Sequence, residues 1–159
     1  MSSKLVITSV EKLQDKLEQT VRQNSGTYCI YVSLNKTQKS TEEGLRKAGI
    51  STDKLFFIDC VTSEKSRDDV LHISPIELNM LSTAILTFIK EVPGDKSLII
   101  DALSTLLIFN NENKVAKFVK EITEYASQNK VTVIAFSPLT KGEELLNKIF
   151  NFFDQVDKS

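Results

Sequence analysis

Asp101 has a residue type and a setting from which chemistry can be expected. The apolar run at residues 97–100 leads directly into it, and Ala102-Leu103-Ser104 follows. A carboxylate at the end of a buried strand can hold Mg²⁺ directly or through water. An Asp at such a position is also typical of a helix cap, because its side chain accepts a backbone N–H of the next helix. Asp101 and Ser104 are therefore a candidate nucleotide-binding site, with capping as the structural alternative.

The sequence offers few metal ligands or nucleophiles elsewhere. His72 is the only histidine, and Cys29 and Cys60 are the only cysteines. Their spacing does not fit a metal site, and no G-x-S-x-G elbow supports Ser-His-Asp catalysis. We expect the cysteines to pack as small hydrophobic residues, and we expect no metal and no cofactor.

A receiver-like signalling domain is an alternative that also alternates strands and helices. Asp59 would then be the phosphate acceptor, and Ser137 and Lys141 would imitate the later hydroxyl and lysine. Such domains resemble one another in an acidic cluster after the first strand, where this chain has Thr8-Ser9. The sequence therefore disfavours phosphotransfer.

A modest basic group surrounds residues 36–47 and consists of Lys36, Lys39, Arg46 and Lys47. Such a group can meet phosphates, but two glutamates in the same segment partly neutralise it. Aromatic residues do not interleave with it as a single-strand binding groove requires. We therefore expect a solvated helix face and no nucleic-acid partner.

Length and composition indicate one ordinary globular domain, residues 1–159. Twenty basic and 21 acidic side chains give a net charge of −1, so no global field attracts nucleic acid or an anionic membrane. The longest uncharged apolar stretch, residues 78–89, is shorter than the roughly 20 residues that cross a bilayer. The first residues lack the apolar core of a secretory signal. We expect a cytoplasmic protein with no membrane partner.

Helix signals recur along the chain. Pro75 is placed at a first helical position, Gly26 and Gly49 are expected to close the first two helices, and residues 111–129 keep the apolar spacing of one helical face. Capping boxes, in which Ser or Thr is followed three residues later by Glu, predict four helix starts. They are Thr8/Glu11, Ser40/Glu43, Ser74/Glu77 and Thr140/Glu143.

Short β-branched and aromatic runs between these helices predict strands. Two of them are apolar on both alternating faces, which is typical of strands covered by helices on both sides. The alternation predicts an α/β fold, a three-layer α/β/α sandwich with a mostly parallel sheet. The predicted strands are residues 28–34, 55–58, 97–100 and 131–136, with 4–7 and 70–73 as further short ones.

Three segments together carry a family resemblance: GTYCIYVSLNKTQKSTEEGLRKAGI, LFFID and SLIIDALSTLL. In order and spacing they resemble the RecA-like ATPase domain of the KaiC type, over residues 26–136. The resemblance implies a RecA-like P-loop NTPase fold and places Asp101 at the Walker B position. It also implies a phosphate-binding P-loop before the first segment and a catalytic glutamate after the strand containing YVSL.

Both of these expected features are altered here. Val6-Ile7-Thr8-Ser9 runs almost directly into the first predicted helix, without the glycines and lysine that wrap phosphates. The pair Gly44 and Gly49 has the right separation, but Ile50-Ser51 replaces the Lys-Ser/Thr ending. The pair also lies at the end of a helix that leads into a strand, the reverse of the required strand-loop-helix order. Asn35-Lys36 stands where the glutamates are expected, and neither side chain can act as a general base.

Exposed apolar patches mark interfaces. Two apolar stretches therefore favour a protein partner or self-association, and they are residues 103–109 and 149–153. We therefore expect a non-catalytic regulatory or protein-interaction module, a pseudo-ATPase that lacks Walker A and the catalytic glutamate. It would act in signal transduction or with a true ATPase. The alternative is a sensor that binds ATP at Asp101 and Ser104 without hydrolysing it.

Overall fold

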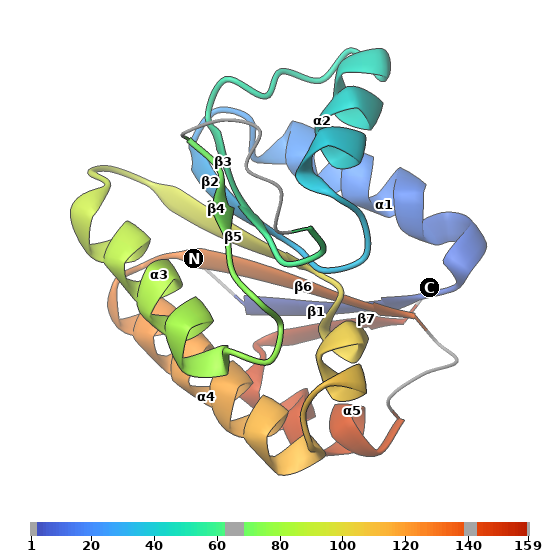
Figure 1. Ribbon diagram of the computed structural model, residues 1–159, viewed down its shortest axis with the longest axis vertical. Helices are drawn as coiled ribbons and strands as arrows, with labels where there is room; N and C mark the ends of the chain where they lie inside the picture. The colour runs from blue at the N-terminus through green and yellow to red at the C-terminus, as the bar shows by residue number, and fades with distance from the viewer. Residues whose placement is uncertain (1–2, 63–68, 139–142, 159) are drawn as a thin grey trace.

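The computed structural model describes residues 3–62, 69–138 and 143–158. Within these ranges the strands are β1 (Ser3–Thr8), β2 (Tyr28–Ser33), β3 (Leu55–Asp59), β4 (Leu71–His72), β5 (Lys96–Asp101), β6 (Thr132–Pro138) and β7 (Gln155–Lys158). They form one sheet in the order β4-β3-β2-β5-β6-β1-β7, and every pairing is parallel (Figure 1). The carboxyl ends of these strands therefore share one edge.

Helices cover both faces of the sheet. On one face lie α1 (Val10–Gln23) and α2 (Gln38–Lys47), and on the other lie α3 (Leu78–Glu91), α4 (Glu112–Gln128) and α5 (Glu143–Ile149) (Figure 1). Short 3₁₀ helices, η1 (Leu103–Ile108) and η2 (Phe150–Phe152), join the second group. The predicted three-layer α/β/α sandwich is confirmed, and the sheet is wholly parallel.

Two hydrophobic cores fill the spaces between these layers. The central strands β5 and β6 are buried from their second residue onward because each face meets helices. Leu17, Val21 and Leu45 line the core under α1 and α2, while Leu81 and Val115 belong to the core under α3, α4 and α5. The uninterrupted apolar runs of the central strands thus follow from their position.

The helix starts differ from the predicted capping boxes. Ser9, not Thr8, precedes α1, and its side chain makes no capping hydrogen bond. The side chain of Thr37 caps α2 by accepting the N–H of Ser40, so the predicted start at Ser40 is wrong. At α2, competition between nearby hydroxyls explains the shift, since a hydroxyl close to a helix start can accept a free N–H.

The third helix begins later than predicted. Residues 74–77 form a turn in which the main-chain oxygen of Ser74 accepts the N–H of Glu77, and α3 starts at Leu78. Pro75 therefore lies in that turn and not at the first helical position. The predicted start at Thr140 lies outside the described residues, and α5 begins at Glu143.

The helix at residues 111–129 and the closing glycine of α2 are better predicted. α4 covers Glu112–Gln128, and the Asn111 side chain caps it by accepting the N–H of Lys114. Gly49 has φ +74°, the left-handed conformation that ends a helix. In contrast, α1 ends at Gln23 with Asn24 as its cap, two residues before Gly26. The six predicted strands are present with ends shifted by a residue or two, and β7 is an additional one.

Candidate functional site

Asp101 ends β5 at the shared carboxyl edge of the sheet. It pairs in register with Ser33, the last residue of β2, so the segments that follow these two strands lie side by side. The Asp101 side chain is 2% exposed. The carboxylate is thus placed where ligands bind in open parallel sheets, but it is enclosed by protein.

Neighbouring side chains occupy both carboxylate oxygens of Asp101. The Tyr31 hydroxyl donates to Oδ2 at 2.8 Å, and the Asn35 side-chain amide donates to Oδ1 at 3.2 Å. Asn35 in turn accepts a hydrogen bond from the Thr105 hydroxyl. The main-chain oxygen of Asp101 accepts the N–H of Leu34 at 2.7 Å. The network joins β5 to the end of β2 and to the start of η1.

Burial dominates the electrostatics of this network. It raises the pKa of the Asp101 carboxyl, while the Tyr31 hydrogen bond, the Lys36 charge and the Asn35 hydrogen bond lower it. Burial also raises the pKa of Tyr31 well above its ordinary value, with the charge and hydrogen bond of Asp101 adding to the shift. Tyr31 therefore remains a protonated donor at neutral pH.

The capping interpretation of Asp101 is wrong. Ala102 occupies the cap position of η1, and no side chain caps that helix there. The peptide bond between Asp101 and Ala102 is cis. Ser104 lies in η1 and is half-buried, and the side-chain donors to Asp101 in the described structure are those of Tyr31 and Asn35. The two predicted nucleotide-site residues are close in sequence, but no hydrogen bond joins them.

The junction between β1 and α1 is one residue long. β1 ends at Thr8, α1 begins at Val10, and only Ser9 stands between them. Val10 is 64% exposed at the same edge of the sheet as Asp101. In the sheet, β6 separates β1 from β5. This junction contains none of the glycine-rich chain with which a phosphate loop wraps its ligand.

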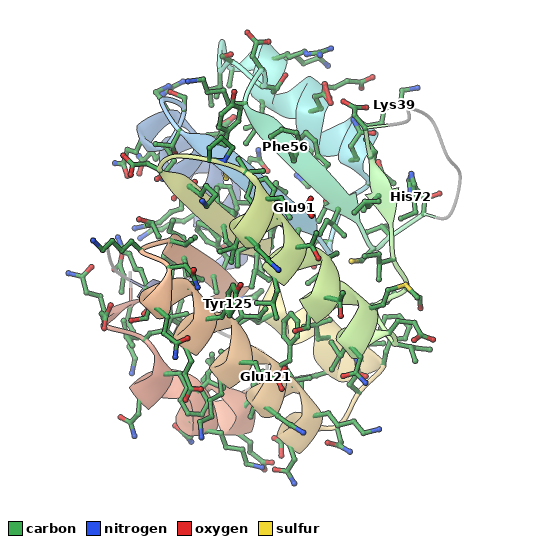
Figure 2. The ribbon with its side chains drawn as sticks, turned by 90° about the vertical axis from the view of Figure 1, so that its left-hand side faces the viewer. Lys39, Phe56, His72, Glu91, Glu121 and Tyr125 are labelled. Carbon is green, nitrogen blue, oxygen red and sulfur yellow. The ribbon has the colours of Figure 1, made fainter. Side chains whose placement is uncertain are left out.

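Lys36 bridges the edge of the sheet to α1. Its ammonium donates to Oε1 of Gln14 at 2.8 Å, and its charge also acts on Asp101. The main-chain oxygen of Lys36 accepts a hydrogen bond from the Ser33 hydroxyl. In the basic group predicted around α2, Arg46 forms an ion pair with the buried Glu42 at 2.7 Å. Lys39 of the same group is exposed to solvent and is labelled in Figure 2.

Asp59, at the end of β3, is a second buried carboxylate whose oxygens are occupied. Its Oδ2 accepts the N–H of Gln38 at 2.9 Å, and its Oδ1 accepts those of Val61 and Thr62 at 2.8 and 3.0 Å. Asp59 therefore fixes the start of α2 and the turn after β3. Strands β2 and β5 lie between Asp59 in β3 and Ser137 in β6, and Lys141 lies outside the described residues.

The histidine and the cysteines do not form one cluster. Cys29 packs in the core under α1 and α2, whereas Cys60 packs in the opposite core. His72 lines a cavity of about 250 Å³ with Cys60, and its Nδ1 lies 2.6 Å from the main-chain oxygen of Thr62. Across residues 3–62, 69–138 and 143–158, no three His, Cys, Asp or Glu side chains gather as metal ligands.

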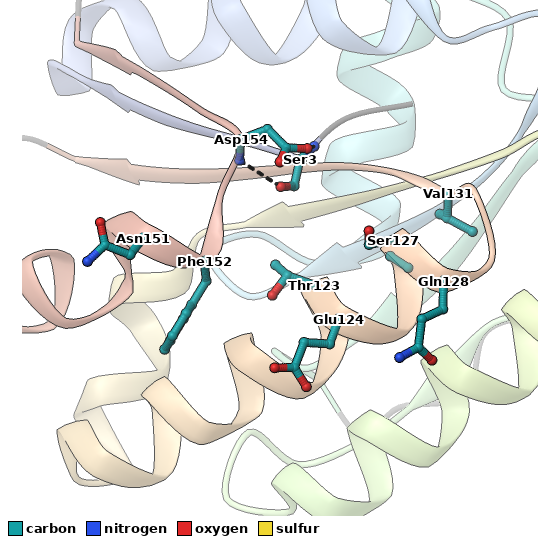
Figure 3. Close-up of a pocket in the computed structure, with 10 residues that line it drawn as sticks. Ser3, Thr123, Glu124, Ser127, Gln128, Val131, Asn151, Phe152 and Asp154 are labelled. Carbon is teal, nitrogen blue, oxygen red and sulfur yellow. Dashed lines mark hydrogen bonds between the residues drawn. The ribbon is translucent and has the colours of Figure 1, made fainter.

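A polar cleft of about 350 Å³ lies at the opposite, amino-terminal edge of the sheet (Figure 3). Ser3 and Asp154 form two reciprocal hydrogen bonds there. The Ser3 main-chain N–H donates to Oδ2 of Asp154, and the Asp154 main-chain N–H donates to Oγ of Ser3, each at 3.0 Å. Thr123 and Glu124 of α4 and Phe152 of η2 face the same space. Among these described residues, no side-chain hydroxyl donates a hydrogen bond to a carboxylate.

Comparison with known proteins gives a fold and no close relative. No protein-family model and no curated protein matches the sequence. Among solved structures, a KaiC-like protein from the archaeon Pyrococcus horikoshii superposes with a TM-score of 0.75 at 13% identity, over 98% of this chain and 70% of that one. The chain has a KaiC-like, RecA-type α/β fold.

Two other P. horikoshii structures share this KaiC-like fold at 13% identity. One is an uncharacterised protein in complex with an unknown peptide, with a TM-score of 0.73 over 99% of this chain and 76% of that one. The other has a TM-score of 0.67 over 99% and 81%. In the described part of the chain, no helix has the length and apolarity needed to span a membrane.

Sequence reasoning finds Asp101 and Asn35 but misses Tyr31. Tyr31 lies inside a strand of apolar residues, where an aromatic side chain ordinarily signals packing. Its partnership with Asp101 depends on β2 lying beside β5 and on both side chains pointing to the same face of the sheet. The register explains the shared face, because Tyr31 is two residues from Ser33, the partner of Asp101, and residues two apart on a strand point to the same side.

Proposed function

We propose that the chain is a non-catalytic regulatory or protein-interaction module, a pseudo-ATPase built on the KaiC-like fold. The observation that carries this proposal is that the Asp101 carboxylate has both oxygens bonded to Tyr31 and Asn35. A Walker B carboxylate must present an oxygen to Mg²⁺ or its water. Asp101 instead serves as an internal link of the fold.

Two further features support the absence of ATP hydrolysis. The one-residue junction at Ser9 leaves no loop whose N–H groups could surround phosphates. Asn35 and Lys36 supply an amide and an ammonium where hydrolysis requires a general base, and Lys36 donates to Gln14. The chain would then act through surfaces that bind another protein, either a true ATPase or a signalling protein.

Thermal unfolding with and without saturating Mg-ATP tests this proposal. A ligand at 100 times its dissociation constant stabilises the folded state by about 2.7 kcal/mol, a shift that is easily measured. We expect no shift with Mg-ATP, Mg-ADP or Mg²⁺ alone. A clear shift with ATP would overturn the proposal.

The competing function is a sensor that binds ATP at Asp101 and Ser104 without turning it over. The observation in favour of the sensor is the position of Ser104. This half-buried residue lies three residues after Asp101, next to the carboxyl edge of the sheet. In that case Mg-ATP would stabilise the wild type, and Asp101→Asn and Ser104→Ala would each abolish the shift. Asp53→Asn, at an exposed position between α2 and β3, is the matched control.

A further inference from the structure

Four large apolar side chains are exposed at one corner of the molecule. Ile76, just before α3, is 59% exposed, and Met80, in the first turn of α3, is 55% exposed. Ile108 ends η1 at 71% exposure, and Phe109 follows at 47%. The remainder of the apolar run at residues 103–109 includes the buried Leu103 and Leu106. Only the end of this predicted partner stretch therefore faces solvent.

A hydrogen bond fixes these two exposed segments beside each other. The Asn110 side-chain amide donates to the main-chain oxygens of Pro75, at 2.8 Å, and of Leu106, at 3.0 Å. Ile76 and Phe109 are the chain neighbours of Pro75 and Asn110. The two segments that carry these exposed side chains therefore lie beside each other, and we call this part of the molecule the α3–α4 corner.

A groove of about 310 Å³ runs between the start of α3 and the first half of α4 at this corner. Ile76, Leu78 and Phe118 are its apolar lining. Figure 2 shows α3 and α4 side by side, with Glu121 of α4 labelled. The corner therefore combines raised apolar side chains with a hollow beside them.

Charges of both signs line the same groove. Glu77, Lys114, Lys117 and Glu121 are all exposed. None of the four has an oppositely charged group within 4.0 Å in the described ranges, whereas Lys120 and Glu124 on the same helix do pair. The rim of the groove thus presents two positive and two negative side chains that form no ion pair within these ranges, and its apolar centre consists of Ile76, Leu78 and Phe118.

We propose that the α3–α4 corner binds a second copy of this chain across a two-fold axis. A two-fold contact uses one patch on both protomers, so the patch must be complementary to itself. An apolar centre with equal numbers of unpaired lysines and glutamates meets this requirement, because the lysines of one copy can face the glutamates of the other. The inference rests on the proposed interaction role and names the partner.

The charge pattern disfavours a partner that carries one sign of charge. An acidic segment would meet Glu77 and Glu121, and a basic segment would meet Lys114 and Lys117, at a cost in both cases. A second copy brings the apolar groups together and leaves each rim charge an opposite partner. Interfaces with an apolar core and a polar rim have this composition.

Sedimentation velocity of the full chain and of two charge variants tests the inference. We expect the wild type to be a dimer at tens of micromolar. Lys114→Glu/Lys117→Glu makes the rim wholly acidic, Glu77→Lys/Glu121→Lys makes it wholly basic, and each variant alone should be a monomer. An equimolar mixture of the two should form a dimer again, because each acidic rim then meets a basic one.

Circular dichroism and thermal unfolding of each variant establish that it is folded. Lys39→Glu/Lys47→Glu, at exposed positions of α2, makes the same change of charge and should leave the dimer intact. A monomeric wild type, or charge variants that dimerise alone as the wild type does, would overturn the inference. Neither result bears on the Mg-ATP test, so failure here and failure of the pseudo-ATPase proposal are distinguishable.

Discussion

The Tyr31 hydroxyl and the Asp101 carboxylate are hydrogen-bonded at 2.8 Å across two adjacent strands, and both side chains are at most 2% exposed. Each polar group takes the place of the water that the other has lost. Since an unpaired buried polar group costs more than a made hydrogen bond gains, the two side chains stabilise the fold only as a pair.

Removing the carboxylate should therefore destabilise the protein through its partner. We expect Asp101→Ala to lower the free energy of unfolding in urea by about 1–3 kcal/mol, because the Tyr31 hydroxyl is left buried without its acceptor. Tyr31→Phe/Asp101→Ala should cost clearly less than the sum of the single changes. Strict additivity would contradict the coupling. Ser104→Ala is the control and should stay within about 0.5 kcal/mol of the wild type.

Stability should also depend on pH through Asp101. Burial raises the pKa of this carboxyl, against the opposing effects of Tyr31, Lys36 and Asn35. The folded protein then holds a proton that the unfolded chain, with a pKa of about 4, has already lost. The free energy of unfolding falls with rising pH wherever the folded state binds more protons, so this contribution is present below about pH 4 and is lost as pH rises through the raised pKa.

Urea unfolding of the wild type and of Asp101→Asn between about pH 4 and pH 8 measures this dependence. The wild type should lose stability relative to the Asn variant as the pH rises, because the variant has no charge to bury. A difference between the two proteins that does not change with pH would show that the Asp101 titration is not linked to folding.

The parallel sheet is predictable because the sequences of its central strands are continuous apolar runs. Residues 97–100 and 131–136 can be buried only between two layers of helices, and the structure places them there. β7 is not predictable in the same way, because Val156 is its only apolar residue and the other three are polar or charged. It forms at the edge of the sheet by pairing with β1, a contact that no local pattern specifies.

The candidate site is predictable by residue type and not by partnership. The sequence singles out Asp101 as a possible ligand-holding carboxylate, and its position at the carboxyl edge follows from the strand that precedes it. What the carboxylate does depends on Tyr31, which is 70 residues away in the chain. Hydrogen bonds at such separations are set by strand order and register, which local patterns do not contain.

Asp59 should be a structural carboxylate whose loss is felt in α2. Three backbone N–H groups, those of Gln38, Val61 and Thr62, donate to it. Asp59→Ala should lower the free energy of unfolding by about 1–3 kcal/mol, because these N–H groups lose a buried acceptor. It should also speed amide hydrogen exchange at Gln38. The exposed Asp53→Ala should do neither, and equal effects of the two changes would contradict this role.

Cys29 and Cys60 should be unreactive while the protein is folded. Burial raises the pKa of each thiol to about 12, so almost no thiolate, the nucleophilic form, is present at pH 8. An aromatic disulfide reagent at pH 8 should label both thiols at once in guanidinium chloride and only slowly in buffer. Cys60, at 8% exposure, should precede Cys29, at 1%. Cys60→Ala assigns the phases, and rapid stoichiometric labelling of the folded wild type would mean that a thiol is accessible and activated, contrary to its place in the core.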